Sequence, residues 1–126
     1  MVIDTSALLA ILLNESERRF YNEAIEAAAS RIMSVATFIE ISIVIESRFG
    51  AEGLRDLDLF IDRAGIEIAE VDFEQGRLAR QAFSRFGKGR HPARLNYGDC
   101  FPYALAMARG EALLYRGEDF SLIFFK

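Results

Sequence analysis

The chain has 126 residues, the length of one ordinary domain, and 52% of them are hydrophobic, which excludes a largely disordered protein. The formal net charge of −4 excludes a protein that binds nucleic acid over its whole surface, and the single cysteine excludes an internal disulfide. We therefore expect one domain over residues 1–126, in a reducing compartment such as the cytoplasm. The start of the chain has no basic segment like that of a signal peptide, and no apolar run is long enough to predict a membrane span.

The predicted elements begin with a short apolar strand over residues 1–3 and a helix over residues 5–13. Asn14 and Glu17 have the spacing of a capping box, which predicts the start of a second helix. A second brief strand is expected over residues 31–33. The second helix should turn one apolar face toward the core, made of Phe20, Ala24, Ile25 and Ala28.

The next segment, residues 35–45, is rich in β-branched residues, which suit a strand, but its length suits a buried helix. Ser34 can cap such a helix and Gly50 can end it, and these flanks favour the helix. Apolar residues surround this helix almost completely. We therefore expect it to be central, with Glu40 buried.

An amphipathic helix over residues 54–64 follows and ends at Gly65, and residues 66–71 have the pattern of a third strand. Asp72, with Gln75 three residues later, predicts the start of another helix.

A basic loop over residues 87–95 comes next. Asn96 caps a further predicted helix, whose third residue is Asp99. Residues 112–115 form a fourth predicted strand, and residues 122–125 a short fifth one. Strands that alternate with helices predict an α/β fold, with a central parallel sheet of four to five short strands and helices on both faces.

Four acids stand where such a sheet can gather them. Asp4 follows the first strand, Glu40 lies in the helix after the second, Asp119 follows the fourth, and Asp99 lies in the first turn of a helix. In a parallel sheet all four can converge on one crevice, where carboxylates repel one another unless protons or cations intervene. Oxygen ligands select hard ions such as Mg²⁺ or Mn²⁺, and such a site suits phosphodiester hydrolysis.

Each acid taken singly also has an ordinary interpretation. Asp99 can be a helix-start acid that interacts favourably with the helix dipole, and Asp119 can be a turn residue. Glu40 can belong to a structural ion pair with an arginine. The combination of the four, with Asp4 directly after a buried strand, favours a functional site.

Four motifs together resemble those of the PIN-domain ribonucleases, most closely the VapC toxins of bacterial toxin–antitoxin pairs. They are Val2–Ser6, the apolar helix with Glu40, Asn96–Cys100 and Gly117–Phe120. The resemblance implies a PIN-like three-layer fold and a Mg²⁺- or Mn²⁺-dependent endoribonuclease that acts on RNA, often tRNA. It also implies a homodimer, neutralised by a VapB-type antitoxin whose tail lies across the active site.

Carried over residue by residue, the resemblance makes Asp4, Glu40 and Asp99 the acidic triad that holds the metal ion. Asp119 matches a fourth acid at a second, weaker metal position, and Ser6 matches a hydroxyl that hydrogen-bonds to the metal shell. Metal-bound water is the nucleophile in such enzymes, so no general-base histidine is expected. His91, the only histidine, is then interpreted as a loop residue.

Two surfaces have two interpretations each. No acid lies between residues 75 and 98, and within this segment Lys88, Arg90 and Arg94 either hold RNA phosphates or belong to a solvated loop. The apolar residues Phe20, Ile25, Leu54 and Leu57 either belong to the core or line a groove for an antitoxin helix.

Two departures from the family pattern keep an alternative open. The chain end, residues 121–126, looks altered, and Pro102 is expected to kink the helix that begins with Asp99. The alternative is a catalytically impaired PIN-fold module that binds antitoxin or RNA without cleaving it. A phosphohydrolase with Asp4 as covalent nucleophile is a third hypothesis. Its second acid would stand where this chain has Ser6, which disfavours it.

Overall fold

A parallel four-stranded sheet forms the centre of the computed structural model, which describes residues 1–117. The strands are β1 (Val2–Ile3), β2 (Ile32–Ser34), β3 (Glu67–Ala69) and β4 (Leu113–Leu114), in the order β3-β2-β1-β4. The predicted α/β class is confirmed. The expected fifth strand lies outside the described residues.

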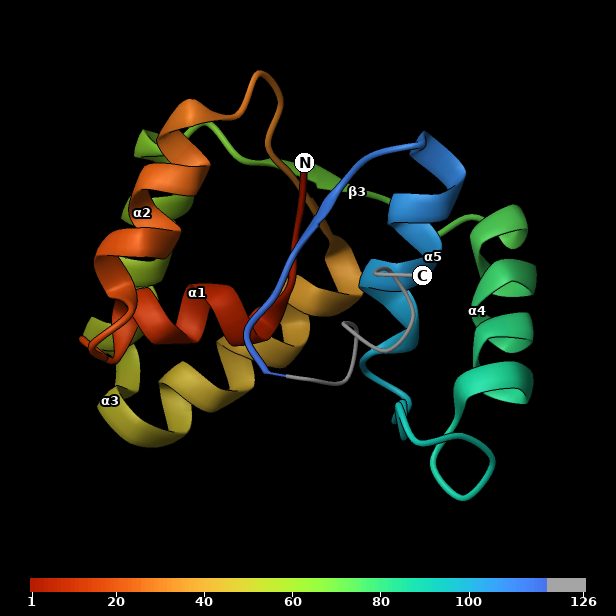
Figure 1. Ribbon diagram of the computed structural model, residues 1–126. Coiled ribbons are helices and arrows are strands. Elements are labelled where there is room, and N and C mark those ends of the chain that lie inside the picture. Colours follow the sequence, from red (N-terminus) through yellow and green to blue (C-terminus); the bar gives the residue numbers. More distant parts are fainter. Residues whose placement is uncertain (118–126) are drawn as a thin grey trace.

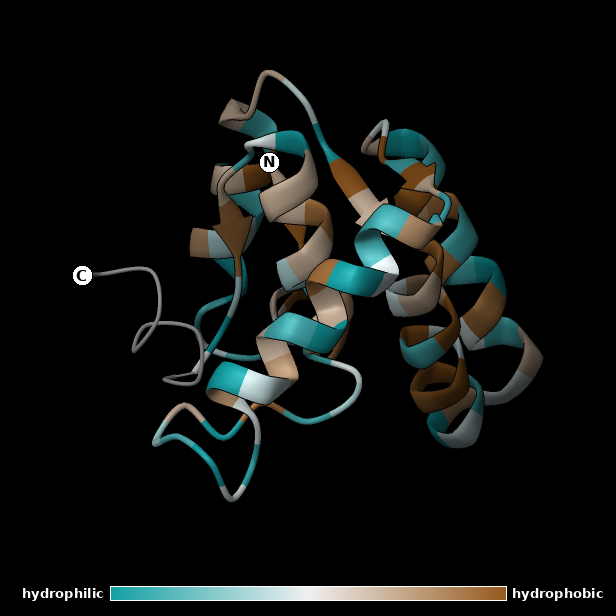
Figure 2. Ribbon diagram, turned by 90° about the vertical axis from the view of Figure 1, so that its right-hand side faces the viewer, coloured by the Kyte–Doolittle hydropathy of each residue, from teal (hydrophilic) through white to brown (hydrophobic). Residues whose placement is uncertain are grey.

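Five helices flank this sheet within the described residues. They are α1 (Thr5–Leu12), α2 (Arg18–Ala27), α3 (Val35–Arg63), α4 (Phe73–Phe86) and α5 (Cys100–Arg109). Figure 1 shows α1, α2 and α3 on one side of the sheet and α4 and α5 on the other, so the fold has three layers. Hydrophobic and hydrophilic bands alternate along the helices in Figure 2, as expected where each helix buries one face.

The strands divide their side chains between two apolar clusters, because successive residues of a strand point to opposite faces. Ile3 and Met33 pack with α1, α2 and α3. Val2 and Ile32 pack on the opposite face, against Leu105 of α5. Both faces of the short sheet are therefore covered at its centre, which explains why β1 and β4 are continuously apolar.

The long helix α3 is two helical segments joined at Gly50, where φ is 65° and ψ is −154°. A side chain at this position would be strained, because positive φ is open mainly to glycine. Ser34 caps the first segment, since its hydroxyl oxygen accepts a hydrogen bond from the Ala36 amide at 3.2 Å. The predicted cap and the predicted stop at Gly50 are both confirmed.

The predicted capping box at Asn14 and Glu17 is wrong. Helix α2 begins at Arg18, and the Glu17 side chain makes no capping hydrogen bond. Asn14 has a φ of 57° and donates its amide to the Ile11 carbonyl, so it ends α1 instead. Asparagine tolerates this left-handed conformation better than most residues do.

The expected kink at Pro102 is also wrong. Helix α5 begins at Cys100, so Pro102 lies in its first turn and not deep inside it. Amides of the first turn have no acceptor within the helix, and a proline there costs no hydrogen bond. No helix among residues 1–117 is long and apolar enough to cross a membrane.

Candidate active site

Asp4 follows β1 at the point where the sheet changes direction. From β1 the chain proceeds to β2 and β3 on one side and returns to β4 on the other. In such sheets ligands bind in the crevice beyond the carboxyl ends of the strands at this switch point. The Asp4 amide donates to the Leu114 carbonyl at 3.0 Å, so the residue lies between β1 and the end of β4.

Burial is the main influence on the Asp4 carboxylate. Only 5% of the residue is exposed, and this desolvation raises the pKa of its carboxyl above the ordinary value. Hydrogen bonds from the amide and hydroxyl of Ser6 lower the pKa, and the nearby charge of Glu40 raises it again. The structure therefore holds a carboxylate in an environment that disfavours its charge.

Ser6 fixes the orientation of this carboxylate. Its amide donates to Oδ2 of Asp4 at 3.0 Å, and its hydroxyl donates to the same oxygen. The Ser6 hydroxyl oxygen in turn accepts a hydrogen bond from the Arg116 amide at 2.8 Å. The predicted supporting hydroxyl thus contacts the first acid directly.

Glu40 lies on α3 close to Asp4, but it is exposed, and the prediction that it is buried is wrong. The apolar residues Ile39 and Ile43 beside it are also exposed, by 53% and 60%. This face of α3 has no cover within the described chain. The Thr5 hydroxyl donates to Oε1 of Glu40 at 2.6 Å. Thr5 was not among the predicted site residues, although its position next to Asp4 was a usable signal.

Gly98, the residue before Asp99, lies against the Glu40 carboxylate. A Cβ atom at Gly98 would lie 2.4 Å from Oε2 of Glu40, so only glycine fits without displacing that carboxylate. Asp99 itself exchanges two hydrogen bonds with Asn96: the Asn96 amide donates to Oδ2 of Asp99 at 3.0 Å, and the Asp99 amide donates to Oδ1 of Asn96 at 2.9 Å. The prediction that Asn96 caps this helix is wrong, because Asp99 is the residue that directly precedes α5 and it makes no side-chain capping hydrogen bond. The two bonds between Asn96 and Asp99 close the turn before the helix instead.

The carboxylate oxygens of this site meet some, but not all, of the requirements of a hard cation. Within residues 1–117, neither Asp4 nor Glu40 forms an ion pair, so no cationic side chain there neutralises the two adjacent carboxylates. Oxygen donors with uncompensated negative charge are the ligands that Mg²⁺ and Mn²⁺ prefer. The same residues contain no group of three or more acidic, histidine or cysteine side chains arranged to hold a metal ion. Asp119 lies outside the described residues.

Comparison with known proteins identifies the family. The family model described as "PIN domain" matches residues 1–125.

The chain belongs to the PIN domain family.

The relatives of this PIN domain are of the VapC type. The chain is 52% identical to "Ribonuclease VapC" of Mycolicibacterium smegmatis over 122 residues, which cover 97% of this chain and 95% of the relative. Two solved structures share the fold. VapC20 of Mycobacterium tuberculosis, described as a toxin that cleaves the sarcin–ricin loop, has a TM-score of 0.78 at 13% identity, with 98% of this chain and 94% of that chain covered. A toxin–antitoxin complex from Klebsiella pneumoniae has a TM-score of 0.74 at 18% identity, with 98% and 92% covered.

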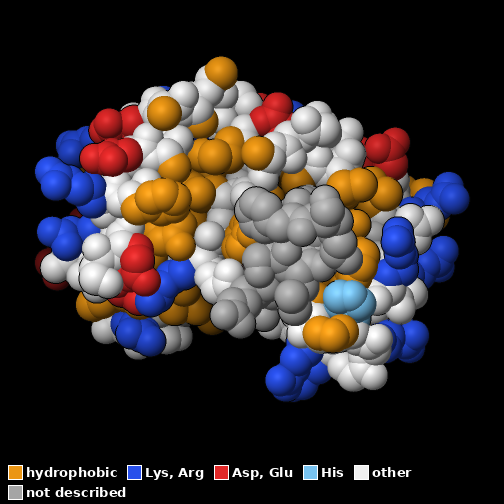
Figure 3. All heavy atoms as spheres, in the orientation of Figure 1, with side chains coloured by type: hydrophobic (Ala, Val, Ile, Leu, Met, Phe, Trp, Pro, Cys, Tyr) orange, Lys and Arg blue, Asp and Glu red, His pale blue; other side chains and the backbone are white. Residues whose placement is uncertain are grey.

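Figure 3 shows Lys and Arg side chains on the side formed by α4 and the loop after it, and others at the opposite edge of the molecule. Lys88, Arg90 and Arg94 are exposed, and none of them forms an ion pair within the described chain. His91 is a structural loop residue, since its Nδ1 accepts a hydrogen bond from the Ala93 amide at 2.9 Å.

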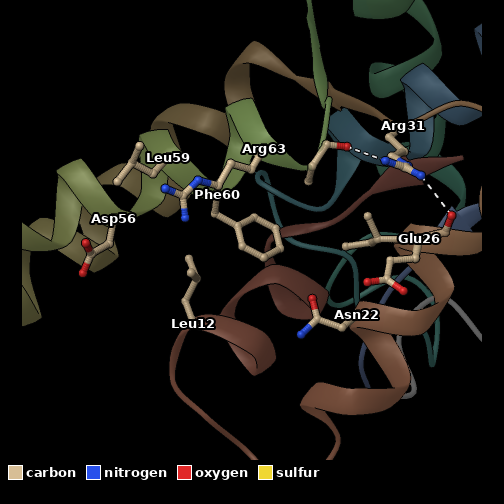
Figure 4. A pocket seen from close by; sticks show the side chains of 10 residues that line it. Leu12, Asn22, Glu26, Arg31, Asp56, Leu59, Phe60 and Arg63 are labelled. Atoms are coloured by element: carbon tan, nitrogen blue, oxygen red, sulfur yellow. Dashed lines mark hydrogen bonds between the residues drawn. The ribbon is translucent and has the colours of Figure 1, made fainter.

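A separate cavity of about 400 Å³ lies between α1, α2 and the second segment of α3. Of the four residues predicted for a groove, only Ile25 lines it. Leu57 is fully buried core, and Phe20 is 65% exposed elsewhere. Figure 4 shows Leu12, Leu59 and Phe60 around the cavity, and Arg31 donating hydrogen bonds to main-chain carbonyls at its edge.

Proposed function

We propose that this PIN domain is the toxin of a toxin–antitoxin pair and a Mg²⁺- or Mn²⁺-dependent endoribonuclease. The observation that carries the proposal is the pair of adjacent carboxylates, Asp4 and Glu40, at the switch point of the sheet. Asp4 is buried there with no cationic partner among residues 1–117. The relative named ribonuclease, at 52% identity over nearly the whole chain, supports RNA as the substrate. The proposal includes an RNA substrate such as tRNA and a cytoplasmic location.

Asp4, Glu40 and Asp99 are the residues we propose to hold the metal ion, with Asp119 as a fourth ligand. A divalent cation, when bound, supplies the positive charge that a phosphodiester needs as negative charge builds on its oxygens. The protein orients the carboxylates that would hold the ion. Ser6 holds the Asp4 carboxylate and Thr5 holds that of Glu40, each by a hydroxyl hydrogen bond.

The test is RNA cleavage by Asp4→Asn, which keeps the size and the capping ability of the side chain but removes the charge. We expect cleavage in the presence of Mg²⁺ or Mn²⁺ to be abolished. The matched control is Asp72→Asn, because Asp72 caps α4 in the same way but is exposed. Equal cleavage rates for the parent and Asp4→Asn would refute the proposal.

One observation favours the alternative of an impaired module: the described residues contain no three-ligand group for a metal ion. Calorimetry with Mn²⁺ separates the two functions. Micromolar binding that is lost in Asp99→Asn supports the enzyme, whereas no binding, together with no cleavage, supports the module.

We further propose that a VapB-type antitoxin binds the cavity beside Leu12, Leu59 and Phe60. The apolar part of its lining suits the apolar face of a helix, and the polar and charged residues around that part suit the helix's polar edges. The Klebsiella structure with the same fold is a toxin–antitoxin complex. Leu59→Arg should prevent the protein from co-purifying with its antitoxin, which we expect to be encoded by the neighbouring reading frame. Phe73→Arg, at an exposed aromatic on α4, is the control.

The exposed face of α3 supports the predicted homodimer. Ile39 and Ile43 are one helical turn apart and both more than half exposed, which forms an apolar stripe on that helix. Ile43→Glu should produce monomers in sedimentation velocity, whereas an exposed polar site on the same helix, Glu46→Gln, should not.

A further inference from the structure

A second cavity lies between α4 and α5, and its lining is almost entirely apolar. Its volume is about 420 Å³, within the roughly 300–1,000 Å³ range of small-molecule pockets. It is lined by Gly76, Ala79, Arg80, Phe83, Tyr97, Cys100 and Phe101.

Aromatic rings form the open wall of this cavity. Tyr97 is 79% exposed, an unusual exposure for a large ring, and its centroid lies 4.9 Å from that of Phe101 at an interplanar angle of 79°. In an edge-to-face pair, the ring that presents its edge keeps both faces free of its partner. At least one flat aromatic face is therefore available for stacking.

The position of Tyr97 ties the cavity to the acidic site. Gly98, the next residue, lies directly against the Glu40 carboxylate. Consecutive Cα atoms are about 3.8 Å apart, so the backbone that carries Tyr97 passes close to the Glu40 carboxylate. One short loop therefore joins the cavity to the acidic site.

The charge at the rim of the cavity is positive. Arg80 lines it, and the Arg90 guanidinium lies 5.9 Å from the centroid of Phe83, one of its walls. Neither arginine forms an ion pair within residues 1–117.

We propose that this cavity is a subsite for one unpaired nucleobase of the RNA substrate, which stacks on Tyr97 while Arg80 and Arg90 contact flanking phosphates. Aromatic faces combined with arginines are the common means of binding single-stranded RNA. The proposal rests on the proposed ribonuclease function and deepens it, because it makes Tyr97 a residue that selects single-stranded over paired RNA.

The test uses tryptophan fluorescence, because the chain contains no tryptophan. Tyr97→Trp places the only one at the cavity, and Phe73→Trp places it at an exposed aromatic on α4 that does not line the cavity. Both are titrated, without metal, with short oligo(A), oligo(U) and oligo(C) RNAs and with an abasic oligonucleotide of equal length. We expect the base-containing RNAs to quench the tryptophan fluorescence of Tyr97→Trp. The abasic oligonucleotide should leave that fluorescence unchanged. The fluorescence of Phe73→Trp should change with neither kind of oligonucleotide.

Affinity measurements distinguish the contribution of base stacking from that of phosphate contacts. Tyr97→Ala should raise the Kd for oligo(A) about tenfold or more without changing its salt dependence, whereas Arg80→Gln should lower the salt slope by roughly one phosphate contact. Gly76→Leu fills the cavity and should act like Tyr97→Ala. A Cβ at Gly76 meets nothing within 4 Å, and this helical position gains helix propensity, so the fold should tolerate the change.

Two results would overturn the subsite. Equal quenching by base-containing and abasic RNA would show that only the backbone is bound. An unchanged Kd for RNA in Tyr97→Ala, with an altered sedimentation coefficient, would make the cavity a protein-binding surface. Neither result depends on cleavage, so failure of the ribonuclease proposal in Asp4→Asn remains distinguishable from failure of this one.

Discussion

Asp4 and Asp72 perform the same local task in different surroundings. Each precedes a helix in extended conformation, and each accepts a backbone amide, from Ser6 at 3.0 Å and from Gln75 at 2.9 Å. Asp72 is exposed, whereas Asp4 is 5% exposed and its pKa is raised by burial. A capping aspartate therefore does not need burial. The cap alone does not explain the unfavourable burial of Asp4, whereas the proposed metal site would.

The largest difference between the two aspartates should appear when each is replaced by alanine. Both variants lose a cap, which costs about 1 kcal/mol of folding free energy. Only Asp4→Ala should also lose RNA cleavage, by about a hundredfold or more, because it removes a proposed metal ligand. Urea unfolding and a gel-based cleavage assay measure the two effects. Comparable loss of cleavage in Asp72→Ala would remove the distinction.

The second-largest difference between variants of the two aspartates should be in metal binding. Mn²⁺ at about 100 times its Kd should stabilise the parent by roughly 2.7 kcal/mol, because it binds only the folded state. Asp72→Asn should show the same rise in Tm, and Asp4→Asn should show little or none. Thermal unfolding with Mn²⁺ and with EDTA measures this, and an equal rise in all three proteins would contradict the assigned site.

The pH dependence of stability without metal should differ as well. The raised pKa of Asp4 means that the folded state binds more protons than the unfolded state between pH 3.8 and the folded pKa. The stability contributed by Asp4 therefore falls as pH rises through this window and stays constant above it. Asp4→Asn lacks this loss and should gain stability over the parent as pH rises. Urea unfolding in EDTA across this pH range measures the free energy of unfolding of both proteins. Parallel curves of this free energy against pH would count against the effect.

The smallest effects should come from residues that hold Glu40. Gly98→Ala places a Cβ against the Glu40 carboxylate, whose flexible side chain can move aside, so cleavage should fall about tenfold with little change in Tm. Glu46→Gln, at an exposed polar position on α3, is the control. Thr5→Val removes the donor to Glu40 and should reduce cleavage several-fold. Unchanged cleavage in both variants would mean that the position of Glu40 is not critical.

The sequence predicted what depends on local pattern and chain order. The alternation of strands and helices gave the parallel sheet, and Asp4 directly after an apolar strand pointed to the switch point. The exposure of Glu40 was not predictable from its apolar neighbours, because periodicity does not show which helix faces other elements leave uncovered. Asn14 was misassigned for a related reason: asparagine suits both a cap and a left-handed residue, and only tertiary packing decides between them.

Pro102 also determines where α5 can begin. If the helix were extended by one turn toward Asn96, the nitrogen of Pro102 would have to donate a hydrogen bond, and proline has no hydrogen to give. The turn that contains Tyr97 and Asp99 is thus prevented from winding into regular helix, whatever occupies the neighbouring crevice. Pro102, which the sequence pattern indicated as a kink, instead limits how far α5 extends toward its N-terminus, and it keeps Tyr97 and Asp99 in the same short loop.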